Sequence, residues 1–223
     1  MVRRTKEEAQ QTREAILEAA EHVFHRKGLS RSSLRDVADE AGLTRGAIYW
    51  HFKNKHDLFA AITERCQIPK RHLRAIAESP TQEDPLGRMR DFLLFMTRDI
   101  AENSRSRRIF EIIFHKTELT EDNEPLSSRH RQMFQDATNS MRTILQNAIA
   151  RGQLSPDLDV ERAILQLHIK LTGLIYFWLL LPDTFDLAIE SERMVDTYIY
   201  TLQNCPDMGK SLPQDQPTQG NHV

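Results

Sequence analysis

The sequence predicts an all-α protein of about nine helices, and three observations support this. Apolar residues recur at helical spacing along most of the 223 residues, while the alternation typical of strands is almost absent. Glycine and proline number only eight and nine, so long helices can form. Two short helical segments flank a glycine turn near the N-terminus, whereas the later segments are long.

Composition limits the class of protein. With 28% charged and 39% hydrophobic residues, the chain suits a soluble globular protein. The N-terminus lacks the apolar region of a signal peptide, and the longest apolar run, residues 171–181, is shorter than the roughly 20 residues of a membrane span. Cys66 and Cys205 belong to no metal or redox motif. We therefore expect a cytoplasmic protein with reduced cysteines.

The first two helices are predicted from their end signals. Thr5 and Glu8 form a capping-box pattern at the start of the first helix, and Gly28 ends it. Ser33 begins a similar pattern before a helix of about eight residues. Gly42 ends this second helix, because glycine adopts the left-handed cap conformation at little cost.

The third helix follows at once. Thr44 can cap it, and it extends to about His51. A short helix, a glycine turn and another short helix form the helix-turn-helix arrangement, whose second helix enters the DNA major groove. Residues 1–54 are therefore predicted to be a DNA-binding domain.

Four consecutive aromatic rings end this third helix, and a helical wheel separates them. Phe52 lies on the face of Ile48 and should be buried, whereas Tyr49 and Trp50 point away. Gly46 leaves a flat place between the two outward rings, and Arg45 lies beside them. This face is predicted to contact another surface.

The chain over residues 55–205 is predicted to form a second, larger helical domain. Its first section, 55–78, reads as one long helix that Pro69 should kink or split. Residues 206–223 are polar and rich in proline, and we expect a disordered tail. Five helical patterns lie between these sections, near residues 86–100, 109–114, 134–148, 160–181 and 187–204.

The stretch TREAILEAAEHVFHRKGLSRSSLRDVADEAGLTRGAIYWHFKNKHDLF, residues 12–59, resembles the DNA-binding domain of TetR-family repressors. MVRRTKEEAQ, TRGAIYWHFK, IFHKTEL and LLLPDTFDL are similar to segments of the AcrR/TtgR subgroup, which represses multidrug efflux operons. The resemblance covers roughly residues 1–205 and weakens after residue 60.

This resemblance implies that residues 55–205 are a ligand-binding and dimerisation domain with 55–78 as its connecting helix. It implies a ligand-responsive homodimer that represses transcription at a palindromic operator. It implies that a lipophilic small molecule in the helical domain moves the connecting helix and changes the spacing of the two recognition helices. Release from DNA would then follow, since both half-sites must be met together. The regulated genes would be a multidrug efflux operon.

The resemblance also assigns candidate DNA contacts. Base or groove contacts are expected from Arg45, Gly46 and Tyr49, and phosphate contacts from Ser33, Thr44, His51 and Lys55. Trp50 is predicted to contact DNA from its outward angle, with packing on the first helix as the alternative. His51 has a similar alternative, packing on its own domain. Arg3, Arg4 and Lys6 could form a basic arm on the DNA or remain solvated.

Candidate ligand residues share the inner faces of the long helices, where phenylalanine and methionine make an adaptable apolar surface. They are Met89, Phe92, Leu93, Met96, Phe110, Phe114, Phe134 and Met141. For any single one of them, ordinary core packing is the more common role, and the candidate site rests on the set as a whole. His168 and Thr172 are the polar groups on the matching face, and no carboxylate clearly stands there. The predicted ligands are therefore neutral and lipophilic.

The dimer interface is predicted on the last two helices, which carry more apolar surface than one chain readily buries. Its candidate residues are Gly173, Ile175, Trp178, Leu179, Met194 and Tyr198.

Two other classes of protein remain as alternatives: a helical ligand-binding or adaptor protein whose helix-turn-helix contacts protein, and an all-α enzyme. The sequence contains no GxSxG, HExxH, GxGxxG or P-loop motif, so no catalytic residue is predicted. His22 and His25 form a lone pair on a helix, and neither a metal nor a cofactor is expected.

Overall fold

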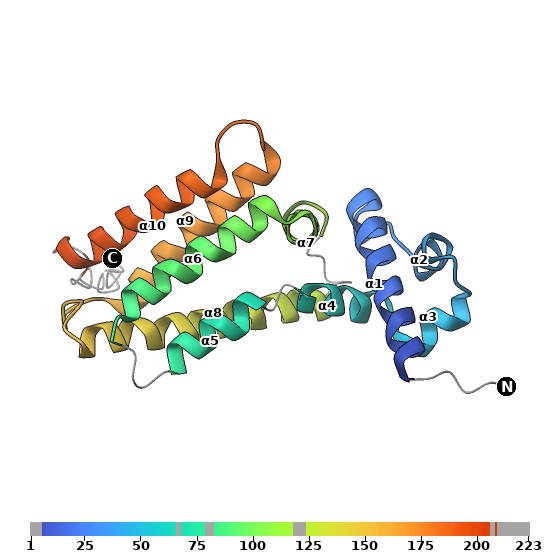
Figure 1. The fold of residues 1–223 in the computed structure, drawn as a ribbon, viewed down its shortest axis with the longest axis horizontal. Helices are drawn as coiled ribbons and strands as arrows, with labels where there is room; N and C mark the ends of the chain where they lie inside the picture. The colour runs from blue at the N-terminus through green and yellow to red at the C-terminus, as the bar shows by residue number, and fades with distance from the viewer. Residues whose placement is uncertain (1–5, 66–67, 79–82, 118–123, 206–207, 209–223) are drawn as a thin grey trace, which may run out of the picture.

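The structure is a computed structural model that describes residues 6–65, 68–78, 83–117, 124–205 and 208. These residues form ten helices and no strand, which confirms the all-α prediction. The helices are α1 Lys6–Lys27, α2 Leu34–Ala41, α3 Arg45–His51, α4 Lys55–Arg65, α5 Ile68–Glu78, α6 Pro85–Glu102, α7 Ser104–His115, α8 Glu124–Ala150, α9 Val160–Leu180 and α10 Leu187–Asn204. In Figure 1, α1–α3 lie at one end of an elongated molecule, α5, α6 and α8–α10 at the other, and α4 and α7 between them.

The caps of α2 and α3 form as their sequences predict. Ser33 and Asp36 make a reciprocal capping box, and Gly42 ends α2 with a φ of 65°, in the left-handed region. Thr44 caps α3 by accepting a hydrogen bond from the backbone N–H of Ala47 at 3.3 Å. These caps fix the turn between α2 and α3.

Pro69 accounts for the tenth helix. The expected connecting helix over 55–78 is two helices, because α4 ends at Arg65 and α5 begins at Ile68. Pro69 is the second residue of α5, where the missing N–H has no intrahelical partner to lose. The chain therefore splits here, and α5 packs on α6 and α8.

The core around the helix-turn-helix does not stop at residue 54. Leu58, Phe59 and Ile62 of α4 are buried in it, and so are Ile109 and Ile112 of α7. One long helix and two short ones bury little apolar surface by themselves, so the two extra helices complete the core. The packing unit around the helix-turn-helix thus extends past residue 54 into α4 and α7, and the domain boundary at residue 54 stays a prediction.

A larger core lies among α5, α6, α8, α9 and α10. Tyr198 of α10 is buried there and donates a hydrogen bond to the carbonyl of Ala163 at 2.8 Å. Met208 also packs against this core, and its carbonyl accepts a hydrogen bond from the N–H of Asp159 at 3.0 Å. The prediction of a disordered tail from residue 206 is wrong at Met208, and the rest of that tail lies outside the described residues.

Candidate DNA-binding surface and effector domain

Helix α3, the predicted recognition helix, has one buried and one exposed face. Ile48 and Phe52 are buried at 0% and 3% exposure, whereas Tyr49 and Trp50 are exposed at 48% and 73%. The wheel assigned these four side chains to the same two faces. A tryptophan this exposed leaves a large apolar surface in water, and such surfaces mark contact sites for another molecule.

Arg45 and Tyr49 are held together on the exposed face. A guanidinium nitrogen of Arg45 donates a hydrogen bond to the Tyr49 hydroxyl at 3.2 Å, and the guanidinium carbon lies 5.5 Å from the ring centroid. A Cβ added to Gly46 would meet only the Thr44 hydroxyl, at 3.9 Å. The fold therefore has room for a side chain at Gly46, and its absence leaves this face flat.

His51 lies at the edge between the two faces. Its ring meets the Trp50 ring edge-on at 4.5 Å and lies 6.3 Å from the Phe52 ring. The imidazole is partly buried, so it supports the outward position of Trp50. The predicted phosphate contact of His51 stays a prediction.

Two other predicted phosphate contacts have partners inside the protein. The Ser33 hydroxyl accepts a hydrogen bond from the N–H of Asp36 and donates one to its carboxylate at 2.8 Å. The Lys55 ammonium donates to the carbonyls of Leu29 and Ser30, at 3.1 and 3.0 Å. Because an ammonium has three N–H groups, Lys55 keeps at most one for DNA.

Thr44 and the basic arm complete the predicted DNA contacts. Thr44 is exposed at the start of α3, beside Arg45. Lys6 is exposed at the first turn of α1, whereas Arg3 and Arg4 lie outside the described residues.

The structure does not bring the ten predicted ligand residues together around one site. Four of them are buried in the larger core among α5, α6 and α8–α10: Met89, Phe92, Leu93 and Met141. Three are partly buried around a smaller core cluster of α6, α9 and α10: Met96, Phe110 and Phe114. The first four are packing residues in this structure, and a ligand role for any of the seven stays a prediction.

The other three form a separate group between α8 and α9. Phe134 is exposed at 49%, and its ring lies 4.1 Å from the His168 ring. The Thr138 hydroxyl makes a hydrogen bond with His168 at 3.2 Å. Burial lowers the pKa of His168, which favours the neutral imidazole. Thr172 is exposed one turn further along α9.

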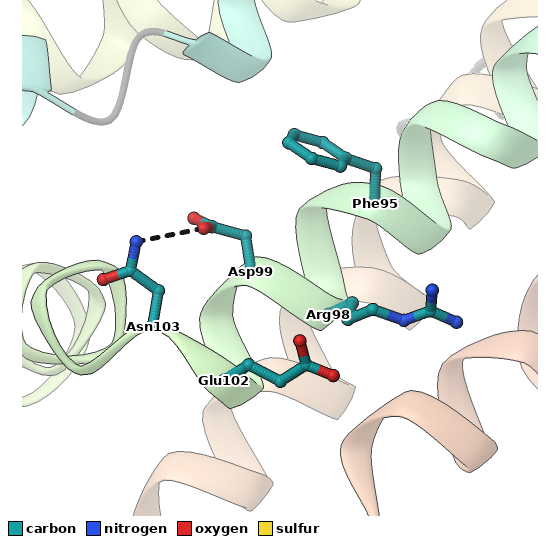
Figure 2. Close-up of a pocket in the computed structure, with 5 residues that line it drawn as sticks. All are labelled: Phe95, Arg98, Asp99, Glu102 and Asn103. Carbon is teal, nitrogen blue, oxygen red and sulfur yellow. Dashed lines mark hydrogen bonds between the residues drawn. The ribbon is translucent and has the colours of Figure 1, made fainter.

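A surface hollow of about 240 Å³ lies along α6, lined by Phe95, Arg98, Asp99, Glu102 and Asn103 (Figure 2). None of the predicted ligand residues lines it. Asp99 accepts a hydrogen bond from the Asn103 side chain at 3.2 Å and another from Ser106 at 2.5 Å. Sequence reasoning missed these residues, because their helical spacing is that of an ordinary solvent-facing stripe.

Two protein-family models match the chain, one over the helix-turn-helix part and one over the later helices. The family of bacterial regulatory proteins of the tetR type matches residues 16–62, and the C-terminal region of MAATS-type transcriptional repressors matches residues 84–204. The chain belongs to the TetR family of transcriptional regulators.

Relatives within the TetR family are similar over nearly the whole chain. TtgR of Pseudomonas putida is 44% identical over 210 residues, covering 94% of this chain and all of TtgR. AcrR of Shigella flexneri is 34% identical, covering 93% of this chain and 97% of AcrR. Both are described as HTH-type transcriptional regulators.

Solved TetR-family structures have the same fold. NalD, the secondary repressor of the MexAB-OprM multidrug efflux pump in Pseudomonas aeruginosa, aligns with a TM-score of 0.80 at 32% identity, covering 90% of this chain and all of NalD. A complex of SmeT with triclosan aligns with a TM-score of 0.81 at 29% identity, covering 93% of this chain and all of SmeT. Proteins of the TetR family bind operator DNA and function as dimers with small-molecule effectors.

The predicted dimer residues are mostly covered inside the protomer. Four of the six are buried, at 7% exposure or less: Ile175, Trp178, Leu179 and Tyr198. Gly173 and Met194 are partly buried, and Met194 packs on the larger core. These side chains offer little surface to a second copy, and their place in a dimer interface stays a prediction.

The exposed apolar side chains of α9 lie on its opposite face. We define the α9 stripe as Leu165, Ile169, Tyr176 and Leu180, which are exposed at 39–58% and follow helical spacing. By length and composition α9 could also cross a membrane, although core helices pass the same test. The sequence alone did not separate the two faces, because α9 is apolar on nearly all sides.

Proposed function

We propose that this TetR-family protein is a dimeric repressor that binds a palindromic operator, is released by neutral lipophilic molecules and controls a multidrug efflux operon. The observation that carries the proposal is the exposed face of α3, with Arg45, Tyr49 and Trp50 around the flat place at Gly46. We further propose that it acts in the cytoplasm.

The exposed face of α3 suits the major groove. A guanidinium can donate to the acceptors of guanine, and aromatic rings can pack on thymine methyl groups and sugars. The contact between Arg45 and Tyr49 holds both side chains on this face before DNA arrives, which reduces the entropy lost on binding.

The α9 stripe supports dimerisation with a second copy. Its side chains extend along most of a 21-residue helix and stay exposed in the protomer, although Tyr176 also contacts His115 of α7. If a second copy packs its own α9 stripe against this one, both stripes are buried. A two-fold symmetric interface has this arrangement, because the same surface is used on both subunits. Two linked recognition helices then match the two halves of a palindrome.

The effector class follows from the chemistry of the helical domain and from a relative. Met96, Phe110 and Phe114 are adaptable apolar side chains around a core cluster, and His168 favours its neutral form. SmeT, which has the same fold, was solved with triclosan, a small lipophilic molecule. Regulation of an efflux operon rests on NalD, which represses an efflux pump.

Selection from a random duplex library, followed by gel shift at several salt concentrations, tests the proposal. Wild-type protein should select a palindrome, and saturating triclosan should weaken binding to it. Tyr49→Ala should weaken operator binding by roughly 1–3 kcal/mol because a groove contact is lost.

Phe95→Ala is the matched control, because Phe95 is exposed at 47% on α6, far from α3 in the chain. It should leave operator affinity unchanged. If the wild-type protein retains no duplex even at low salt, the repressor proposal fails and a protein-binding adaptor becomes the better interpretation. Normal affinity of a folded Tyr49→Ala protein would remove Tyr49 from the contact surface.

A further inference from the structure

Glu21 of α1 is a charged side chain with 0% exposure, which is unusual for a carboxylate. It faces three arginines from two other helices. One carboxylate oxygen accepts a hydrogen bond from Arg65 of α4 at 2.5 Å, and the other lies 3.5 Å from Arg105 and 3.8 Å from Arg108 of α7. We call Glu21 and these three arginines the Glu21 cluster.

Arg65 ties α4 to α1 through two carboxylates. Its second terminal nitrogen pairs with Glu14, about two turns before Glu21 on α1. Burial lowers the pKa of the Arg65 guanidinium, but its hydrogen bonds to Glu21 and Glu14 outweigh this effect and leave the pKa raised. Arg65 is also the last residue of α4, so the end of that helix is attached to α1.

Three further contacts join α7 to the DNA-binding domain. Ile109 and Ile112 are buried in its core. His25 of α1 pairs with Glu111 at 2.5 Å. The N–H of Leu29, just after α1, donates to the carbonyl of Lys116 at 2.9 Å. The whole length of α7 is thus connected to α1 and the segment after it.

The other side of α7 faces the effector domain. The Arg107 guanidinium lies 4.7 Å from the Trp178 ring of α9, and the His115 ring lies 4.5 Å from Tyr176. Ser106 donates a hydrogen bond to Asp99 of α6. A movement of α6 or α9 that displaces α7 therefore acts on a helix that is already part of the DNA-binding core.

A buried carboxylate gains little net stability from its ion pairs, because removing charge from water offsets most of the attraction. The hydrogen bond from Arg65 instead favours one position of α4 against α1, and the charges of Arg105 and Arg108 hold α7 on the other side of the same carboxylate. One residue of α1, Glu21, thus meets both α4 and α7. A residue that contacts both helices in this way can make the three helices move together when one of them is displaced.

We propose that Glu21 is a positioning residue that makes α1, α4 and α7 move as one body, so that displacement of α7 by an effector reaches the recognition helix. This inference rests on the proposed function. Without the charge of Glu21, α7 keeps its apolar contacts to α1 but loses its charged contact, so a displacement of α7 moves α1 less and effector binding releases DNA less completely.

The test compares Glu21→Gln with wild type in the ratio of operator dissociation constants with and without saturating triclosan. The amide keeps the size of the side chain and removes its charge. If triclosan weakens wild-type operator binding about 30-fold, Glu21→Gln should show about threefold or less, within the usual range of coupling between sites. A merely structural role would lower stability without changing this ratio.

Arg108→Gln is the second variant, because its side chain is partly exposed and the protein should fold even when Glu21→Gln does not. It should lower the ratio in the same direction. Arg74→Gln is the matched control, since it breaks an arginine–glutamate pair within α5 and should leave the ratio unchanged. A wild-type ratio in folded Glu21→Gln or Arg108→Gln protein overturns the proposal.

Hydrogen exchange tests the coupling between α1 and α7 without DNA or effector. In wild type, the amides of α1 and α7 should become exposed in one cooperative opening, whereas in either variant α7 should exchange on the order of tenfold faster than α1. Unchanged exchange also overturns the proposal. If wild-type protein binds no duplex, the proposed function fails. The hydrogen-exchange measurement still decides whether the Glu21 cluster couples α7 to α1.

Discussion

Lys55 has two interpretations at the scale of the single residue. Its position after the recognition helix favours a phosphate contact, whereas its ammonium donates to the carbonyls of Leu29 and Ser30. The second function needs no DNA, because these bonds attach the start of α4 to the link between α1 and α2. The geometry therefore favours a structural function with at most one N–H left for a phosphate.

Replacing Lys55 by methionine separates the two functions. Lys55→Met should lower the free energy of unfolding by about 1–3 kcal/mol, because two carbonyls lose a charged donor in a partly buried place. Urea denaturation measures this loss. Lys53→Met, at an exposed position two residues earlier, is the control and should have little effect.

A Lys55→Met protein as stable as wild type, with a smaller salt dependence of operator binding, would instead support the phosphate contact.

The orientation of a single side chain could be predicted from the sequence where helical spacing alone determines it. The orientations of Ile48, Tyr49, Trp50 and Phe52 follow from helical spacing, and the structure has them as expected. The partners of Lys55 are 25 and 26 residues away in the chain, and nothing in the local pattern indicates them. Glu21 was missed for the same reason, since its arginines come from α4 and α7.

At the scale of the element, α2 depends on charges at its first turn. Its capping box joins Ser33 and Asp36, and Lys27 at the end of α1 donates to the same carboxylate at 2.6 Å. The hydrogen bond from Lys27, followed by those from Ser33, lowers the pKa of Asp36 from an ordinary 3.8 to about 2.

This shift predicts how α2 responds to acid. A carboxylate with a lowered pKa in the folded state stabilises the fold above its ordinary pKa, and the contribution is lost as pH falls through the folded value. Wild-type stability should therefore decline between about pH 4 and pH 2, and Asp36→Asn should flatten this part of the curve. Thermal unfolding followed by circular dichroism measures the change.

Asp39→Asn, on the same helix and exposed, is the control for this measurement. It should keep the wild-type decline. A decline of the same size in Asp36→Asn would assign the acid sensitivity to other carboxylates.

Elements differ in how much of their packing can be predicted. The caps of α2 and α3 and the split at Pro69 follow from residues within a few positions. The faces of α9 do not, because a helix that is apolar on nearly all sides has no polar face to mark the solvent. Which face packs on its own core depends on where α6, α8 and α10 lie.

At the scale of the whole molecule, the α9 stripe predicts a dimer. Ile169→Asp places a charge in the middle of the proposed interface and should shift the protein to a monomer, because a buried unpaired charge opposes association. Light scattering coupled to size-exclusion chromatography measures the mass at several concentrations. Operator affinity should fall together with the dimer fraction.

The control is Phe95→Asp, an exposed aromatic side chain of α6 outside the stripe, which should stay dimeric. A dimer of unchanged strength in Ile169→Asp would move the interface away from the stripe.

The burial of Ile109 and Ile112 in the core around α1–α4 also matters for building chimaeric regulators. The tetR-type segment, residues 16–62, contains the recognition helix but not these two side chains. Joined to a foreign sensor, that segment would expose an apolar surface shaped for α7. A chimaera should therefore include α7, or a designed helix of the same shape, together with α1–α4. The DNA-binding segment and this helix of the second domain form one packing unit.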